Sequence, residues 1–152
     1  MSRERQDLLS RSALGVFRLN GQFLSLAEEL AGPSGLTAAW WQVLGAVLRQ
    51  PLPVSGIARE MGITRQSVQR IADLLVERGL AEYRPNPAHR RAKLLTPTEA
   101  GLAAVRRIDP GHAAFADRLA QAFGEAELAE AVGVLERLSK VLDQLSTDGG
   151  RT

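Results

Sequence analysis

The fold is decided by residues 54–99, which read VSGIAREMGITRQSVQRIADLLVERGLAEYRPNPAHRRAKLLTPTE. Two short helices are predicted in the first half of this stretch, over 54–61 and 65–78, because apolar residues recur there at helical spacing. Gly62 between them suits a tight turn, and Thr64 suits the N-cap of the second helix. A helix, a glycine turn and a helix within about 25 residues form the layout of a helix-turn-helix.

The second helix of the pair has a polar face near its N-terminus. This face is formed by Arg65, Gln66, Ser67, Gln69 and Arg70. In a major groove, arginine offers a bidentate fork to guanine, and glutamine can pair with adenine. The free N–H groups of a helix N-terminus also favour phosphate. We therefore predict that Thr64 and this face contact DNA, and that the acids Glu60, Asp73 and Glu77 lie outside the cluster.

A basic loop follows the helix pair. Residues 80–84 and 92–95 are candidate strands, and the segment between them is too long and too rich in proline for a tight hairpin. This pattern predicts a β-wing whose tip, His89–Arg91, reaches a second groove of DNA, since a narrow minor groove attracts arginine. The residues of this segment expected at DNA are Arg84, His89, Arg90, Arg91 and Lys93.

Helices are also predicted on the N-terminal side of this segment. Apolar spacing indicates one helix over about 5–31, ended by Gly32-Pro33, and another from an N-cap at Thr37 to about residue 49. The first of these helices has apolar residues on two sides, which is typical of a helix with two neighbours.

Two more helices are predicted on the C-terminal side. Gly79 should end the second helix of the pair, and Thr96-Pro97-Thr98-Glu99 reads as a cap, a first-turn proline and a capping-box acid. The helix that follows should reach about residue 123, with an interruption and kink at 109–111. In the last helix, about 125–145, apolar residues seven apart form a seam that packs against a helix of the same or of a second chain.

Composition narrows the function classes. The chain has 152 residues, no cysteine and two histidines, which excludes disulfides and thiolate metal sites. No metal-ligand spacing and no GxSxG, Walker A or GxGxxG pattern is present, so no enzyme, metal or cofactor is predicted. No apolar run is long enough for a membrane span, and the charged N-terminus lacks an apolar signal core, so we expect a cytoplasmic protein with no membrane partner.

Charge is unevenly distributed along the chain. Residues 64–93 carry seven positive and three negative side chains, a balance of +4, whereas residues 109–148 carry three positive and eight negative ones, a balance of −5. A basic middle and an acidic C-terminal third favour one face that meets a polyanion, here double-stranded DNA.

Three other interpretations of these patterns remain open. The polar helix face could be the solvated surface of an ordinary helical bundle, although the basic wing directly downstream argues against this. A winged helix can also serve as a protein-interaction module. A non-specific architectural DNA binder would share the charge pattern but show no sequence preference.

The sequence resembles the MarR family of bacterial and archaeal transcriptional regulators. The resemblance starts at Leu36-Thr37 and rests on the helix-turn-helix, the RGL at 78–80, the proline-flanked basic wing and LTPTEAG at 95–101. The flanking helices extend it to essentially the whole chain. One departure is His89, because the family wing commonly has an acid there that pairs with arginine and braces the wing.

The resemblance implies a mainly α fold with a small β-wing, a winged helix-turn-helix flanked by dimerisation helices. The DNA-binding lobe would span 36–97, between a dimerisation helix in 1–35 and two more in 98–146, with a disordered tail at 147–152. A homodimer of this kind reads a pseudo-palindrome, typically as a repressor, with half-sites about 34–36 Å apart. Small aromatic effectors often control such proteins, and we expect a cleft for one near Arg18, Trp40, Trp41 and His112.

Overall fold

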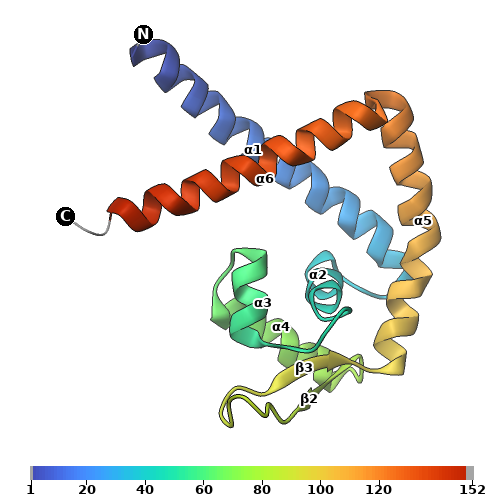
Figure 1. Ribbon diagram of the computed structural model, residues 1–152. Helices are drawn as coiled ribbons and strands as arrows, with labels where there is room; N and C mark the ends of the chain where they lie inside the picture. The colour runs from blue at the N-terminus through green and yellow to red at the C-terminus, as the bar shows by residue number, and fades with distance from the viewer. Residues whose placement is uncertain (1, 150–152) are drawn as a thin grey trace. The chain divides into compact units, whose positions relative to one another are not determined.

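The computed structural model describes residues 2–149, and the chain divides into two compact units, Met1–Pro110 and Gly111–Thr152. The first unit is a helical lobe with a small sheet at one end (Figure 1). Its elements are α1 (Ser2–Ala31), the 3-10 turn η1 (Gly32–Ser34), α2 (Ala38–Ala46), β1 (Leu52–Pro53), α3 (Val54–Met61), α4 (Arg65–Glu77), β2 (Ala81–Arg84), β3 (Leu94–Pro97) and the first half of α5 (Glu99–Phe123). The predicted fold class, mainly α with a small β-wing, is confirmed.

The core of the first unit lies where α2, α3 and α4 pack on one another. Its fully buried large side chains come from these three helices, the C-cap of α2, β3 and α5: Val43, Leu44, Val47, Ile57, Val68, Leu75, Leu95 and Ile108. Each buried aliphatic side chain of this kind contributes about 1.5–3 kcal/mol of transfer free energy to folding. The core therefore fixes the two helices of the helix-turn-helix against each other.

The helix-turn-helix has the predicted geometry. Helix α3 ends at Gly62, whose φ of 67° is left-handed, and the next residue, Ile63, donates its N–H to the Ala58 carbonyl at 3.2 Å. Glycine fits this position because the absence of a Cβ removes the steric cost of a positive φ. Thr64 then caps α4, accepting a hydrogen bond from the Ser67 N–H at 3.1 Å.

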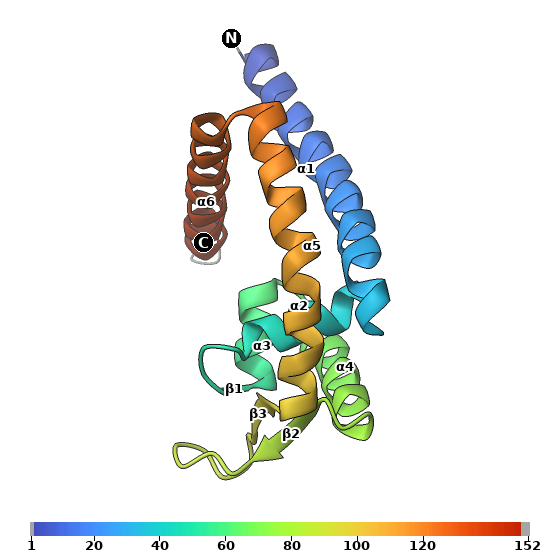
Figure 2. The same cartoon turned by 90° about the vertical axis from the view of Figure 1, so that its right-hand side faces the viewer.

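The wing is built on a three-stranded antiparallel sheet in the order β1-β3-β2. Tyr83 of β2 and Leu52 of β1 both pair with Leu95, one on each side of β3. Strand β1 was not predicted, because a two-residue strand that contains a proline has no periodic pattern to detect. The loop between β2 and β3 extends away from the helices (Figure 2).

Strand β3 and the start of α5 lie two residues later than expected. β3 continues to Pro97 because Leu95 and Thr96 are buried in the sheet, so Thr96 does not cap the next helix. Thr98 caps it instead, accepting the Gly101 N–H at 3.2 Å and donating its hydroxyl proton to the Gly79 carbonyl at 2.6 Å. The prediction that Thr96 caps this helix was therefore wrong, and Thr98 is the cap. The sequence did not distinguish the two threonines, because each is followed by residues that suit the first turn of a helix.

Gly101 marks the closest approach of α5 to the end of α4. A Cβ added there would overlap with the Leu80 carbonyl oxygen, and the same carbonyl accepts the Thr98 N–H at 3.1 Å. The segment after α4 and the first turn of α5 are thus in direct backbone contact, which explains the glycine of LTPTEAG in physical terms.

The N-terminal helices differ from the prediction at their ends. Helix α1 starts at Ser2, and α2 ends at Ala46, three residues before the expected end. Thr37 caps α2 as predicted, accepting the Trp40 N–H at 3.1 Å. After Ala46 the chain turns towards β1, with the Leu48 N–H bonded to the Gly45 carbonyl at 3.3 Å.

The second unit contains the second half of α5 and the whole of α6 (Glu125–Asp148). Gly124, whose φ is 105°, joins the two helices. Helix α5 is continuous through 109–111, so the expected interruption is absent, although the boundary between the units falls at Pro110. α6 extends to Asp148, so residues 147 and 148 of the expected tail are helical, while 150–152 lie outside the described residues. No helix within residues 2–149 combines the length and the apolar character that crossing a membrane requires.

Candidate nucleic-acid interface

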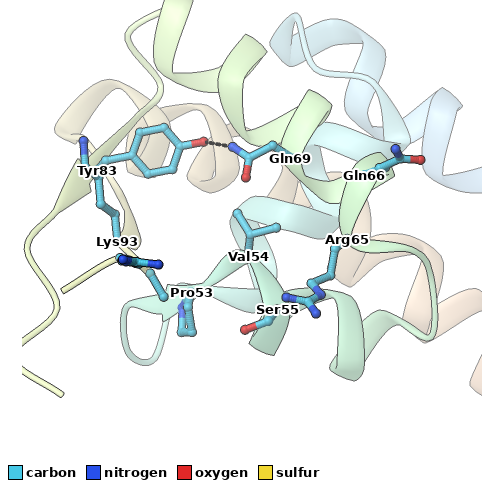
Figure 3. A pocket seen from close by; sticks show the side chains of 10 residues that line it. Pro53, Val54, Ser55, Arg65, Gln66, Gln69, Tyr83 and Lys93 are labelled. Atoms are coloured by element: carbon cyan, nitrogen blue, oxygen red, sulfur yellow. Dashed lines mark hydrogen bonds between the residues drawn. The ribbon is translucent and has the colours of Figure 1, made fainter. Parts of the chain in front are cut away.

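A groove of about 640 Å³ lies between the N-terminal ends of α3 and α4 and the base of the wing (Figure 3). It is lined by Pro53, Val54, Ser55, Arg65, Gln66, Gln69, Tyr83, Arg91, Ala92 and Lys93. Three of these residues are cationic, and none of the described residues that line it is acidic. The groove is therefore a site with a positive potential and several hydrogen-bonding side chains.

The start of α4 forms one wall of the groove. Arg65 and Gln66 occupy its first two positions, where the N–H groups have no partner within the helix. The hydroxyl of Thr64 accepts from the Ser67 N–H and donates to the Ser67 hydroxyl at 2.9 Å, so its role here is that of a cap. Ser67 is half-buried, and Arg70 is exposed on α4 outside the groove lining.

The wing forms the opposite wall through Arg91 and Lys93, both exposed. Its tip is shaped by two successive turns, in which the His89 N–H bonds to the Asn86 carbonyl at 3.2 Å and the Ala92 N–H bonds to the His89 carbonyl at 3.3 Å. The side chain of Asn86 also accepts the Ala88 N–H at 3.0 Å. These hydrogen-bonded turns give the tip a defined backbone conformation. They do so although His89 stands at the position where an acid was expected to pair with arginine and brace the wing.

The predicted wing residues divide into two groups. Arg91 and Lys93 line the groove, while His89 and Arg90 are exposed at the tip beyond it. Arg84 on β2 is held by Glu82, whose carboxylate accepts from its Nε at 3.0 Å and from its Nη2 at 2.8 Å. This pair offsets the charge of Arg84, so Arg84 is less available to a phosphate than the exposed Arg91 and Lys93.

Gln69 is tied to the wing by a network that sequence reasoning missed. Its amide nitrogen Nε2 donates to Asp73 Oδ1 at 3.0 Å and to the Tyr83 hydroxyl at 2.9 Å. The Tyr83 hydroxyl in turn donates to the same Asp73 oxygen at 2.6 Å. Asp73, expected to lie outside the cluster, is thus bonded to one of its predicted members, and α4 is joined to β2.

The environment of Tyr83 keeps its hydroxyl protonated. Burial, the hydrogen bond to Asp73 and the negative charge of Asp73 raise the pKa of Tyr83 above its ordinary value of 10, against a smaller lowering by the Gln69 hydrogen bond. The hydroxyl is therefore a proton donor to Asp73 throughout the neutral pH range.

Other residues of the groove were also missed. Ser55 comes from the first turn of α3, and Pro53 and Val54 from the β1–α3 junction. Their position depends on β1 joining the sheet, which no local pattern indicated. Tyr83 carried a weak signal, because alternation along β2 places residues 81 and 83 on one face of the sheet.

The residues expected near an effector lie in different elements. Arg18 is exposed on α1, and Trp40 and Trp41 are both half-buried on α2 and packed against the core. The guanidinium of Arg78 lies over the Trp40 ring, 5.5 Å from its centroid. Neither tryptophan is fully buried. His112 belongs to the second unit, so the expected cleft stays a prediction.

Within residues 2–149 no group of three or more histidine, aspartate or glutamate side chains is arranged to hold a metal ion.

Residues 34–92 match the sequence model of the MarR family. An uncharacterized protein of Mycobacterium tuberculosis is 39% identical over 132 residues, which cover 87% of this chain and 92% of that protein. A putative transcriptional regulatory protein for the hcr operon of Thauera aromatica is 27% identical over 129 residues, with 82% of this chain and 78% of that protein covered.

Solved structures of similar fold include complexes with DNA. A mutant MarR of E. coli complexed with operator DNA has a TM-score of 0.75 at 21% identity, covering 87% of this chain and 95% of that one. The transcriptional repressor CouR bound to a 23-mer DNA duplex has a TM-score of 0.73 at 25% identity, with coverage of 82% and 89%. CouR from Rhodococcus jostii bound to p-coumaroyl-CoA has a TM-score of 0.66 at 24% identity, with coverage of 83% and 87%.

Proposed function

The chain belongs to the MarR family, and from this membership we propose that it is a sequence-specific transcriptional repressor that binds a pseudo-palindromic operator as a homodimer. The observation that carries the proposal is the cationic groove between the start of α4 and the wing. MarR-family regulators act by binding DNA and not by catalysis, so we propose no chemical reaction for this groove. We also propose that the protein acts in the cytoplasm.

The groove fits the sugar–phosphate backbone of a duplex. In a winged helix the recognition helix lies in the major groove and the wing reaches the adjacent minor groove, so one DNA strand passes between them. Arg65 on one wall and Arg91 and Lys93 on the other would flank that strand, and Ser55 and the free N–H groups of α4 would donate to its phosphates. The exposed pair His89 and Arg90 would continue into the minor groove.

The dimer is supported by apolar surface that the monomer leaves exposed. In α1 this surface includes Phe17, which is 77% exposed, and Leu9, which is 68% exposed. In α6 no residue is buried, and the seam residues Leu135, Leu142 and Leu145 are between 45% and 63% exposed. Exposed apolar faces of this extent are typical of helices that bury them against a second chain.

Control by a small aromatic effector is proposed by analogy with CouR, which has been solved both with p-coumaroyl-CoA and with DNA. No residue of this chain is assigned to the effector beyond the predicted Arg18, Trp40, Trp41 and His112.

Arg91→Ala tests the groove. We expect affinity to fall about uniformly across DNA sequences, and the slope of log affinity against log salt to become shallower by about one, because one phosphate contact is lost. The measurement is a titration of an upstream-region duplex at several salt concentrations. Adding aromatic acids and their CoA thioesters to the same titration tests the effector, which should weaken binding.

Arg106→Ala is the matched control, because Arg106 is an exposed arginine of the first unit that does not line the groove. Its salt slope should equal that of the wild type. An unchanged slope for Arg91→Ala would remove the wing from the interface, and equal affinity for operator and competitor DNA would favour an architectural binder. No DNA binding at all would favour a protein-interaction module.

A further inference from the structure

The first turn of α2 is capped by a side chain of α1 as well as by its own N-cap. Glu28 of α1 accepts the Ala38 N–H through its carboxylate oxygen Oε1 at 3.1 Å, while Thr37 accepts the Trp40 N–H. N–H groups of a first turn have no acceptor within the helix. The carboxylate also lies at the positive end of the α2 dipole. Ala38 is 2% exposed, so water has little access to replace Glu28, and the bond fastens α1 to α2.

The same end of α1 is also held by the chain itself. Ala31 ends α1 and is fully buried in the core, and its carbonyl accepts the Leu36 N–H at 3.2 Å across η1. Leu30 packs against the same core. Glu28 lies almost one turn earlier on the helix. A helix held at its last residues alone can tilt about that point, whereas an additional attachment through a side chain fixes its angle.

The rest of α1 extends beyond this attachment, away from α2 (Figure 1). Its exposed apolar residues Phe17 and Leu9, part of the proposed dimer surface, lie about 16 and 28 Å from Glu28 along the helix axis, at about 1.5 Å per residue. A tilt of about 10° at Glu28 would therefore displace them by roughly 3 and 5 Å. One base-pair step of DNA rises by about 3.4 Å. A small change in the angle of α1 is thus as large, at the dimer surface, as one base pair of DNA.

We propose that Glu28 is a positioning residue for DNA binding, whose bond to α2 sets the angle of α1 and with it the spacing of the two half-sites that the dimer accepts. This inference rests on the proposed function. α1 packs on α2, and α2 packs on the recognition helix α4, so this bond lies between the dimer surface and the helix that reads the bases. Two linked binding modules gain affinity only when the linkage lets both engage at once, and a stiff linkage restricts this to one distance.

The test compares the full chain in four forms: wild type, Glu28→Ala, Glu28→Gln and Glu29→Ala. Alanine removes the acceptor, whereas glutamine removes the charge and keeps an acceptor oxygen on a side chain of the same length. Glu29, the neighbouring exposed acid of α1, is the matched control for the lost charge. Glu28 is exposed and both replacements are good helix formers, so the variants should fold, as circular dichroism and thermal unfolding can verify. If Glu28→Ala did not fold, Glu28→Asp, whose carboxylate is one methylene shorter, would take its place.

The DNA is a set of duplexes that carry the half-sites selected by the wild type, with the spacer varied one base pair at a time, and one duplex with a single half-site. The wild type should bind the best spacing at least about tenfold more tightly than spacings one base pair longer or shorter, because both lobes engage at one distance only. In Glu28→Ala this ratio should fall to about threefold or less, since a tilting α1 lets the lobes follow the DNA. Affinity for the single half-site should be unchanged, and Glu28→Gln and Glu29→Ala should keep the wild-type ratio.

Glu28→Ala with the wild-type spacing ratio would overturn the inference even if the variant melted at a lower temperature, because a merely structural role changes stability alone. A wild type that binds every spacing equally would also overturn it. So would a loss of the ratio in Glu29→Ala or in Glu28→Gln, since the effect would then come from charge and not from the hydrogen bond. A wild type that recognises no specific half-site, or binds two half-sites no better than one, would overturn the proposed function instead, so the two failures are distinguishable.

Discussion

Tyr83 is the one tyrosine of the 152-residue chain, so its ionisation can be followed without interference from another phenol. Its hydroxyl joins β2 to Asp73 on α4, and burial together with Asp73 raises its pKa. A raised pKa of an acid means that folding favours the protonated form. The stabilisation is complete below pH 10, the ordinary value, and is lost as pH rises beyond it towards the folded-state pKa.

We expect the phenolate absorbance of the native protein to appear only above pH 10, at a higher pH than in urea, where the phenol has its ordinary environment. Asp73→Asn should lower the native pKa, because it removes both the charge and the anionic acceptor. Gln69→Ala should raise it, because the Gln69 hydrogen bond is the one contribution that lowers it. The measurement is an ultraviolet titration of the three proteins, and identical curves in native and urea solutions would contradict the network.

Single residues also show how far the candidate site could be predicted. The polar face of α4 and the basic wing were visible because Arg65, Gln66 and Arg91 occupy surface positions in strongly patterned elements. The bond of Gln69 to Asp73 could have been predicted, because the two residues are four apart on one helix, whereas the bond of Asp73 to Tyr83, ten residues away on a strand, could not. The ion pair of Arg84 with Glu82 was equally hidden, since charge counts do not reveal partners.

At the scale of the elements, the junction between the end of α4 and the start of α5 is held by backbone contacts. Thr98 bonds to Gly79 and Leu80, and Gly101 lies against the Leu80 carbonyl. The C-terminal end of α4 is therefore held against the first turn of α5, and this close contact requires glycine at position 101.

Gly101→Ala should destabilise the protein by about 1–3 kcal/mol, because the added Cβ overlaps with backbone that cannot move freely. Gly45→Ala is the matched control. Gly45 also lies in a helix of the first unit, but a Cβ there meets open space, so alanine should stabilise by about 0.5–1 kcal/mol. Urea unfolding of both variants measures the difference. A neutral Gly101→Ala would show that α5 can shift away from Leu80.

Elements with strong local signals were predicted closely, and the others were not. α3 was placed with its true ends, because its apolar periodicity is followed by a glycine with positive φ. The start of α5 was misplaced, because Thr96 and Thr98 are equivalent as local caps and only burial of Thr96 in β3 distinguishes them. β1 exists because β3 offers a free edge, which is a tertiary property and leaves no trace in the sequence of β1 itself.

At the scale of the whole molecule, the proposed dimer accounts for the apolar surface of α1 and α6. Phe17→Asp places a charge where α1 is most apolar and exposed, so we expect a monomer at micromolar concentration in sedimentation experiments. Its affinity for a two-half-site operator should fall by roughly 100-fold, because one lobe no longer helps to hold the other on the DNA.

Leu48→Asp is the control for this variant, since Leu48 is 43% exposed in the segment between α2 and β1 and outside both helices. It should sediment as the wild type does. A dimeric Phe17→Asp protein would remove the centre of α1 from the interface and require another site for subunit contact.

The exposed apolar face of α1 also has a consequence for the cell. A single chain carries one winged lobe, and two lobes are needed for a two-part site. When the amount of protein lies below the dissociation constant of the dimer, operator occupancy rises with the square of the number of chains, and halving expression cuts it about fourfold. The regulator would then respond to its own gene dosage more steeply than a monomeric DNA-binding protein does.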